Sequence, residues 1–145
     1  MRPALHGTFS LEFDVFAEPA RVFAAYADPE LRRTWFRMPA EPGTGHHELD
    51  FRVGGGEIAR GAFAPSGPLE RMEYRSRFLD IADGQRIVLS YEFILDDVRR
   101  WLSSATVEFA PGPGGGTRIT HTEQYAYLAC NPWLPVLPDP APPEP

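Results

Sequence analysis

Lysine is absent from this 145-residue chain, so all 14 of its basic side chains are arginine. The arginines are scattered rather than clustered, and the formal net charge is −6. A negative chain without a basic patch is poorly suited to bind the phosphates of a nucleic acid or an acidic membrane surface. We therefore expect neither nucleic acid nor membrane as a partner.

Cysteine and long apolar runs are also scarce. Cys130 is the only cysteine, which excludes an intrachain disulfide and a cysteine-based metal cluster. No stretch approaches the length of a membrane span, and no early apolar run resembles a signal peptide, so we expect a cytoplasmic location. The hydrophobic content of 43% is ordinary for one globular domain.

The clearest pattern is the alternation of residues 117–125. Five residues from Thr117 to Tyr125 fall on one face of a strand, among them Ile119, His121 and Glu123, and the other face has no apolar residue. The first face is therefore predicted to point inward. Buried polar groups need partners, water or a ligand, so His121 and Glu123 indicate either a ligand cavity or satisfied polar groups at the rim of a sheet.

Similar patterns predict the remaining elements. They are a half-buried strand at 9–15, a helix from Glu18-Pro19, a short helix at 29–34, a hairpin of 46–53 with 57–63, and strands at 69–79, 87–95 and 101–109. This order predicts an α+β fold, in which a curved antiparallel sheet of about six or seven strands carries two short N-terminal helices. The helices can cover only part of the apolar face, which leaves a concave cavity.

Aromatic side chains are expected on this concave face. In residues 46–53, Leu49, Phe51 and Val53 share the inward face, whereas Ile58 and Phe63 have opposite parity and leave the inward face of residues 57–63 open. The predicted ligand-binding residues are Trp35, Phe51, Tyr74, Tyr91, Phe93, His121 and Glu123. For most of the aromatic residues, the alternative to ligand binding is ordinary packing in the hydrophobic core.

The arginines beside Trp35 have two interpretations. Arg32, Arg33 and Arg37 would attract an anionic head group if they faced the cavity, but we interpret them as a solvated helix face.

Catalysis and metal binding have weaker support. Neighbouring His46 and His47 point to opposite faces of a strand and cannot easily share one ion, so no metal and no cofactor are predicted. His121 with Glu123 would suit proton transfer on a bound carbonyl compound. No serine, cysteine or threonine lies in a recognisable nucleophile setting, and the sequence leans against an enzyme.

An ordered set of short motifs runs from about Phe9 to Leu128. It comprises Phe13-Asp14-Val15, Glu18-Pro19, Val22-Phe23, Asp28-Pro29-Glu30-Leu31, Trp35-Phe36, Phe51-Arg52-Val53-Gly54-Gly55-Gly56, residues 74–81, Thr106-Val107-Glu108-Phe109, residues 115–120 and Thr122-Glu123-Gln124. This set resembles the START-like superfamily, also called SRPBCC or helix-grip, and within it the branch named after the heat-shock-protein-90 ATPase activator homologue. The resemblance implies a sheet that grips a long C-terminal helix around a hydrophobic ligand cavity. Relatives include lipid carriers, aromatic polyketide cyclases and co-chaperone domains.

The chain departs from this family after residue 129. Seven prolines between Pro132 and Pro145 forbid the usual helix and favour an extended segment. We therefore predict a START-like domain at 1–129 and a Pro-rich tail at 130–145, without the gripping helix. Either Trp133, Leu134, Val136 and Leu137 lie across the cavity mouth, or a homodimer hides the exposed sheet face.

Three functions are compatible with these features. The leading expectation is the binding of a small hydrophobic or aromatic molecule, or an amphipathic one, in the cavity. The second is a cyclase- or isomerase-type enzyme that uses His121 and Glu123. The third is a co-chaperone-like contact with a protein, through the outer face of the sheet.

Overall fold

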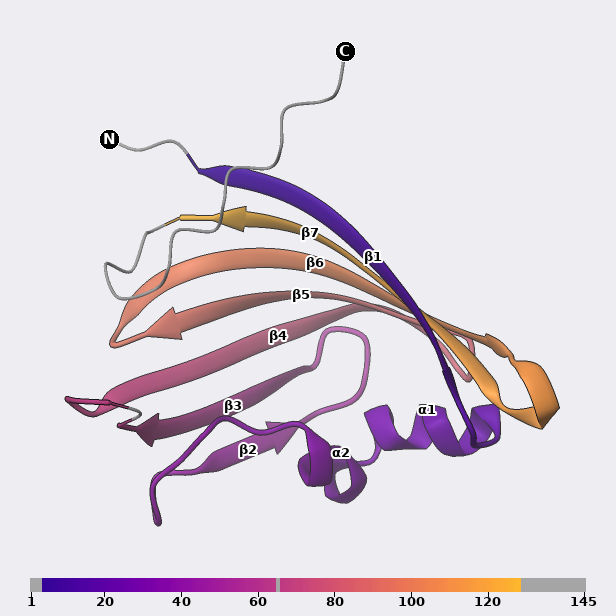
Figure 1. The fold of residues 1–145 in the computed structure, drawn as a ribbon, viewed down its shortest axis with the longest axis horizontal. Helices are drawn as coiled ribbons and strands as arrows, with labels where there is room; N and C mark the ends of the chain where they lie inside the picture. Colours follow the sequence, from indigo (N-terminus) through magenta and orange to yellow (C-terminus); the bar gives the residue numbers. More distant parts are fainter. Residues whose placement is uncertain (1–3, 65, 129–145) are drawn as a thin grey trace.

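The computed structural model describes residues 4–64 and 66–128, which form one curved antiparallel sheet with two short helices on its concave side (Figure 1). The elements are β1 (Leu5–Val15), α1 (Pro19–Ala27), α2 (Pro29–Trp35), β2 (His46–Leu49), β3 (Gly56–Phe63), β4 (Glu70–Ala82), β5 (Arg86–Leu95), β6 (Val98–Pro111), a 3-10 turn (Pro113–Gly115) and β7 (Thr117–Tyr127). The sheet order is β1-β7-β6-β5-β4-β3-β2. The predicted fold class is confirmed.

Tight turns connect the long strands. Asp96 and Asp97 join β5 to β6, and both have positive φ angles, 49° and 64°. Two successive residues with positive φ give the turn whose twist matches the flanking strands of a hairpin. Aspartate tolerates this conformation better than most residues, because its short side chain can bond to the local backbone. This turn lies between the strands predicted at 87–95 and 101–109.

The two helices form a tight corner. Asp28 ends α1, where its N–H donates to the Ala24 carbonyl, and it also caps α2, where its carboxylate accepts from the N–H groups of Glu30 and Leu31. The indole N–H of Trp35, at the end of α2, donates to the Ala25 carbonyl of α1 at 3.0 Å. The corner is thus fixed at two points.

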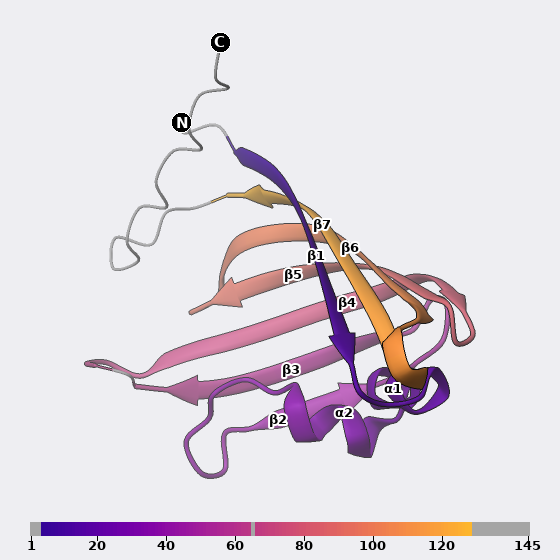
Figure 2. The same cartoon turned by 45° about the vertical axis from the view of Figure 1, so that its right-hand side comes forward.

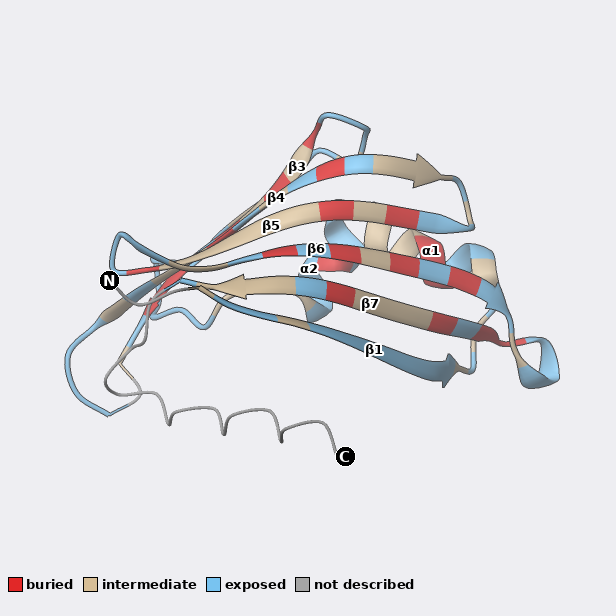
Figure 3. Cartoon of the chain, turned by 90° about the horizontal axis from the view of Figure 1, so that it is seen from above, coloured by how far each residue is buried: buried red, intermediate tan, exposed pale blue. Residues whose placement is uncertain are grey.

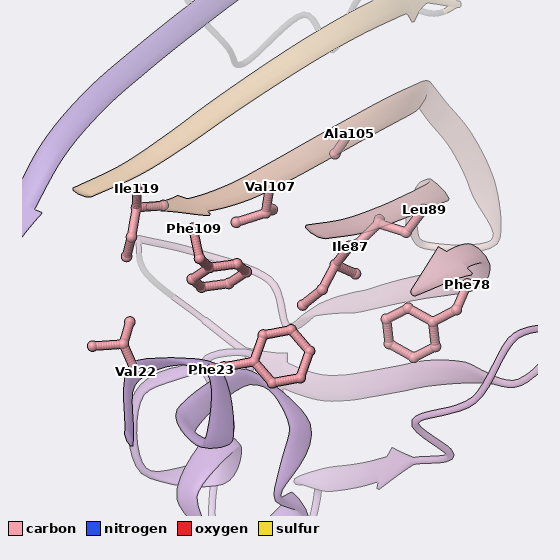
Figure 4. Packing of buried hydrophobic residues seen from close by; sticks show 9 residues of the cluster. All are labelled: Val22, Phe23, Phe78, Ile87, Leu89, Ala105, Val107, Phe109 and Ile119. Atoms are coloured by element: carbon pink, nitrogen blue, oxygen red, sulfur yellow. The ribbon is translucent and has the colours of Figure 1, made fainter. Parts of the chain in front are cut away.

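The apolar core lies between α1 and one end of the sheet. Val22 and Phe23 of α1 point at the strands, and the Phe23 ring lies 5.2 Å from Phe109 and 5.7 Å from Phe51 between centroids (Figure 4). The nine buried members of this core are Val22, Phe23, Phe78, Ile87, Leu89, Ala105, Val107, Phe109 and Ile119. Strands β4 to β7 contribute the seven that do not come from α1, at alternating positions, as the predicted parity requires.

The helices leave the β1 border of the sheet uncovered (Figures 2 and 3). Phe9, Leu11 and Phe13 pair in register with concave-face residues of β7, yet they are 40%, 56% and 44% exposed. The prediction of a half-buried first strand is wrong. Its alternation is correct, but no described element lies over this border of the concave face. The homodimer expected to hide this face stays a prediction.

The region around the triple glycine also differs from the prediction. Strand β2 ends at Leu49, and residues 50–55 form a loop in which Gly54 has a positive φ of 85°. Phe51 turns into the core, whereas Val53 is 57% exposed instead of sharing the inward face. The strand pattern fails here because a glycine-rich loop breaks the two-residue period.

The Pro-rich tail at 130–145, with Cys130 and Trp133, lies outside the described residues, so the domain boundary after residue 129 stays a prediction. Among residues 4–64 and 66–128, no helix follows β7. None of the helices described is long and apolar enough to cross a membrane.

Candidate functional site

A cavity of about 320 Å³ lies between the α1–α2 corner and the concave face of the sheet. Its walls are mainly aromatic and aliphatic, with polar side chains from α2, β3, β5 and β7. The structure brings all seven predicted ligand-binding residues to this cavity: Trp35, Phe51, Tyr74, Tyr91, Phe93, His121 and Glu123. A wider hollow of about 890 Å³ on the outer face has a polar and charged lining that includes Arg75, Arg77 and Gln124. This hollow is more open to solvent than the cavity on the concave face.

The first polar cluster of the cavity, here called the Glu123 cluster, comes from three neighbouring strands. The Glu123 carboxylate accepts from the Ser103 hydroxyl at 2.7 Å and the Tyr91 hydroxyl at 2.9 Å, both on Oε2. Its Oε1 contacts Nε2 of His121 at 2.8 Å. The Trp101 indole in turn donates to the Tyr91 oxygen at 3.3 Å. Alternation in β5, β6 and β7 places all five side chains on one face.

These contacts set the protonation states of the cluster. Burial by itself would raise the pKa of Glu123, but hydrogen bonds from His121, Ser103 and Tyr91 outweigh it and lower that pKa. Burial raises the pKa of Tyr91, and the nearby Glu123 charge raises it further, whereas the hydrogen bond from Trp101 lowers it. Glu123 is therefore an ionised acceptor and Tyr91 a neutral donor.

His121 occupies a more open position than Glu123. Its side chain is 28% exposed against 11% for Glu123, and its ring stacks on Phe9 of β1 with centroids 6.2 Å apart. When Nε2 donates to Glu123, Nδ1 is left as an acceptor. The carboxylate thus fixes the tautomer and the orientation of the imidazole.

The second polar cluster, here called the Glu57 cluster, joins α2 to strands β2 and β3. The Arg32 guanidinium donates to Glu57 from Nε and Nη2, each at 2.9 Å, and Nε2 of His47 contacts the same carboxylate at 2.8 Å. The guanidinium carbon also lies 4.0 Å from the Phe36 ring centroid and 4.3 Å from that of Trp35. Two parallel hydrogen bonds and two aromatic faces hold this cation in place.

Arg32 corrects the interpretation of the arginines beside Trp35 as a solvated helix face. It is only 8% exposed, because Glu57 supplies a buried counter-ion and the aromatic rings cover its planar faces. Arg33, the next residue of α2, is exposed as expected. Sequence analysis missed the Arg32 site because the partner lies 25 positions away on another element.

The open question about residues 57–63 is settled by burial. Glu57 and Ala59 face inward, at 2% and 1% exposed, and Ile58 lies on the other face. His47 shares the face of Leu49, which the sequence predicts to be inward, so its parity was a usable signal for this cluster. Nδ1 of His47 is buried without a hydrogen-bond partner among the described residues.

The sequence also predicts that His46 and His47 point to opposite faces of a strand and cannot easily share one metal ion. His46 is exposed and His47 is buried, so the neighbours do point to opposite faces. Within the part of the chain that the structure describes, no three histidine, cysteine, aspartate or glutamate side chains gather closely enough to hold a metal ion.

Comparison with known proteins identifies the family. Residues 17–130 match the family model described as Activator of Hsp90 ATPase homolog 1-like protein. This chain belongs to that family. No curated protein matches the chain.

Several solved structures share the fold of this Hsp90 ATPase activator-like chain. The Mll3558 protein of Rhizobium loti is 37% identical with a TM-score of 0.75, over 88% of this chain and 84% of that one. A protein of Rhizobium leguminosarum is 36% identical with a TM-score of 0.80, over 89% and 82%. PFC0360w, an HSP90 activator from Plasmodium falciparum, is 18% identical with a TM-score of 0.51 over 80% and 71%, a likeness of fold alone.

Proposed function

We propose that this Hsp90 ATPase activator-like chain binds a small hydrophobic or amphipathic molecule in the cavity on the concave face of its sheet. The observation that carries the proposal is the cavity of about 320 Å³, walled by rings and aliphatic side chains and furnished with a few oriented polar groups. Protein sites for small molecules are typically concave and apolar with few polar points, and they begin near this size.

The cavity combines apolar lining side chains with a few polar ones, and this combination supports ligand binding rather than core packing. Leu89, Val107 and Phe93 line the cavity without filling it. The cavity is open on one side, and an apolar molecule bound there would remove these side chains from water. Glu123 and His121 at the same wall would fix the orientation of an occupant.

The test is a titration with 2-naphthol, followed by the methyl NMR signals of the protein. We expect the methyl signals of Ile87, Leu89 and Val107, all lining the cavity, to shift in a saturable manner. Ala105→Phe places a ring in the cavity wall and should abolish these shifts, because Ala105 lines the cavity. Ala110→Phe adds the same ring at an exposed position of the same strand and is the matched control.

Two results would contradict the proposal. One is the absence of any shift at the cavity methyl groups. The other is binding confined to the exposed β1 residues, with shifts at Leu5 and Leu11 that persist in Ala105→Phe.

A second candidate function is proton transfer on a bound carbonyl compound. The 2.8 Å contact between His121 Nε2 and Glu123 Oε1 favours it, because a carboxylate-oriented imidazole leaves Nδ1 as a base at the cavity. In this case His121 would take the proton, and Glu123 would orient the ring and stabilise the imidazolium. Cyclase- and isomerase-type reactions need a group of this kind.

A further inference from the structure

The hydrogen-bond donors of the Glu123 cluster all point at protein atoms. The Trp101 N–H is directed at Tyr91, and the hydroxyls of Tyr91 and Ser103 and the Nε2–H of His121 are directed at Glu123. What remains for a ligand on this wall are acceptors. An ionised carboxylate has about four lone-pair positions, of which the cluster uses three, and an imidazole that donates from Nε2 offers Nδ1 as an acceptor in its neutral form.

We propose that the ligand of this cavity is an uncharged aromatic molecule that carries a hydroxyl donor, of the phenol or naphthol class, and that the Glu123 cluster rejects carboxylates. This inference rests on the proposed function and adds the chemical class of the ligand. The hydroxyl would donate to Oε1 of Glu123 or to Nδ1 of His121, and the ring would lie among the aromatic walls.

The charge of the cavity supports this selection. Glu123 accepts from two hydroxyls and one imidazole nitrogen, and no arginine is among its partners in the described residues. The Arg32 cation at the other wall is already paired with Glu57 through two hydrogen bonds. An anionic ligand would therefore lie beside the Glu123 carboxylate in a poorly solvated site, without an unpaired arginine on the described cavity wall.

The pKa of Tyr74, on the strand between the two clusters, also shows that a negative charge is disfavoured in this cavity. Burial raises the pKa of its hydroxyl most, and the charge of Glu57 raises it further by more than Arg32 lowers it. Burial and Glu57 thus both disfavour a negative charge at Tyr74. Burial and Glu123 likewise disfavour a negative charge at Tyr91.

The walls favour a flat ring. Phe93 stacks on Trp101 with centroids 4.3 Å apart and planes 12° apart, and Tyr74 and Tyr91 lie 4.9 Å apart. These four aromatic side chains all line the cavity. Offset and edge contacts between rings add to the gain from burying apolar area.

The experiment compares three probes that share one ring system: 2-naphthol, 2-methoxynaphthalene and 2-naphthoate. Their dissociation constants are measured by calorimetry at neutral pH, where the naphthol is uncharged and the naphthoate is ionised. We expect 2-naphthol to bind about tenfold or more tightly than its methyl ether, which lacks the donor, and the naphthoate to bind most weakly. The inference is overturned if the ether or the naphthoate binds as tightly as the naphthol.

Glu123→Gln tests whether the carboxylate makes the selection. The amide removes the charge, and its partners can adapt, because hydroxyls rotate and the imidazole can change tautomer. We expect naphthoate to gain affinity and naphthol to lose it, each by several-fold. Glu108→Gln makes the same change at an exposed position and should alter neither. If Glu123→Gln does not fold, the probe series on the wild-type chain decides alone.

The two proposals fail in different ways. If none of the probes binds, or if binding survives Ala105→Phe, the cavity is not the binding site and the proposed function fails. If all three bind equally and Ala105→Phe abolishes them all, the proposed function stands and only the inference about ligand class fails.

Discussion

The two glutamates that are buried among residues 4–64 and 66–128 use their hydrogen bonds differently. Glu57 is paired with the Arg32 guanidinium and lies among side chains that are 2–10% exposed, so its charge is cancelled within the fold. Within the described part of the chain, Glu123 accepts from Ser103, Tyr91 and His121, and the last of these reaches the open side of the cavity. The same residue type thus ties a helix to the sheet at one site and presents an acceptor surface at the other.

Removal of the Glu57 charge should have the largest effect. Glu57→Gln leaves the Arg32 cation buried without a counter-ion, and we expect a loss of about 3–5 kcal/mol in the free energy of unfolding. Urea denaturation followed by circular dichroism measures this loss. The exposed Arg86–Asp80 pair is the control, and Asp80→Asn should cost roughly 0–1 kcal/mol.

A double variant sharpens this test. Arg32→Met combined with Glu57→Gln removes the stranded cation as well, so the double variant should be more stable than Glu57→Gln alone. If the two variants are equally unstable, loss of packing rather than the uncompensated charge explains the effect.

Tyr91→Phe should have an intermediate effect. It removes one donor from Glu123 and the acceptor of the Trp101 N–H, and we expect a loss of about 1–2 kcal/mol in unfolding free energy. Tyr127→Phe is the matched control, because Tyr127 stacks on the same Trp101 ring with centroids 5.6 Å apart. Equal losses in both variants would mean that the hydroxyl of Tyr91 does not hold the cluster together.

The smallest expected effect is the loss of the stability contributed by Glu123 at acidic pH. The pKa of Glu123 is lower in the folded chain than in the unfolded one, although burial opposes this, so its contribution to stability is present above the unfolded pKa. That contribution is lost as the pH falls through the folded pKa. The difference in unfolding free energy between wild type and Glu123→Gln should therefore narrow as the pH falls below the unfolded pKa of glutamate, about 4.3. A difference that widens toward acid would reverse the assigned sign.

The sequence predicted the concave wall well where the strands alternate strictly. In β5 and β7, parity alone placed Tyr91, Phe93, His121 and Glu123 on one face, and the structure brings all four to one cavity. The period of two needs no tertiary information, because each strand carries its own apolar face. The helix starts were also predictable from local chemistry, such as the Asp28 cap.

The Glu57 cluster could not be predicted in the same way. An arginine on a short helix is normally exposed, and Arg32 is buried only because it pairs with the buried carboxylate of Glu57 on β3. The alternation of apolar residues did not show which face of β3 is inward, because Ile58 and Phe63 have opposite parity. The alternation also failed at Val53, which lies in a loop. The exposure of Leu11 was missed for a related reason, since alternation shows which face is apolar but not whether anything covers it.

The corner at Asp28 has a consequence for how this family can vary in length. Arg32 lies one helical turn beyond Asp28, and each residue of a helix advances the side chains by about 100°. One residue inserted between them would rotate Arg32 away from Glu57 and turn Trp35 off Ala25. The spacing of this short helix is therefore set by a carboxylate on a distant strand, and an insertion between Asp28 and Arg32 would break both contacts.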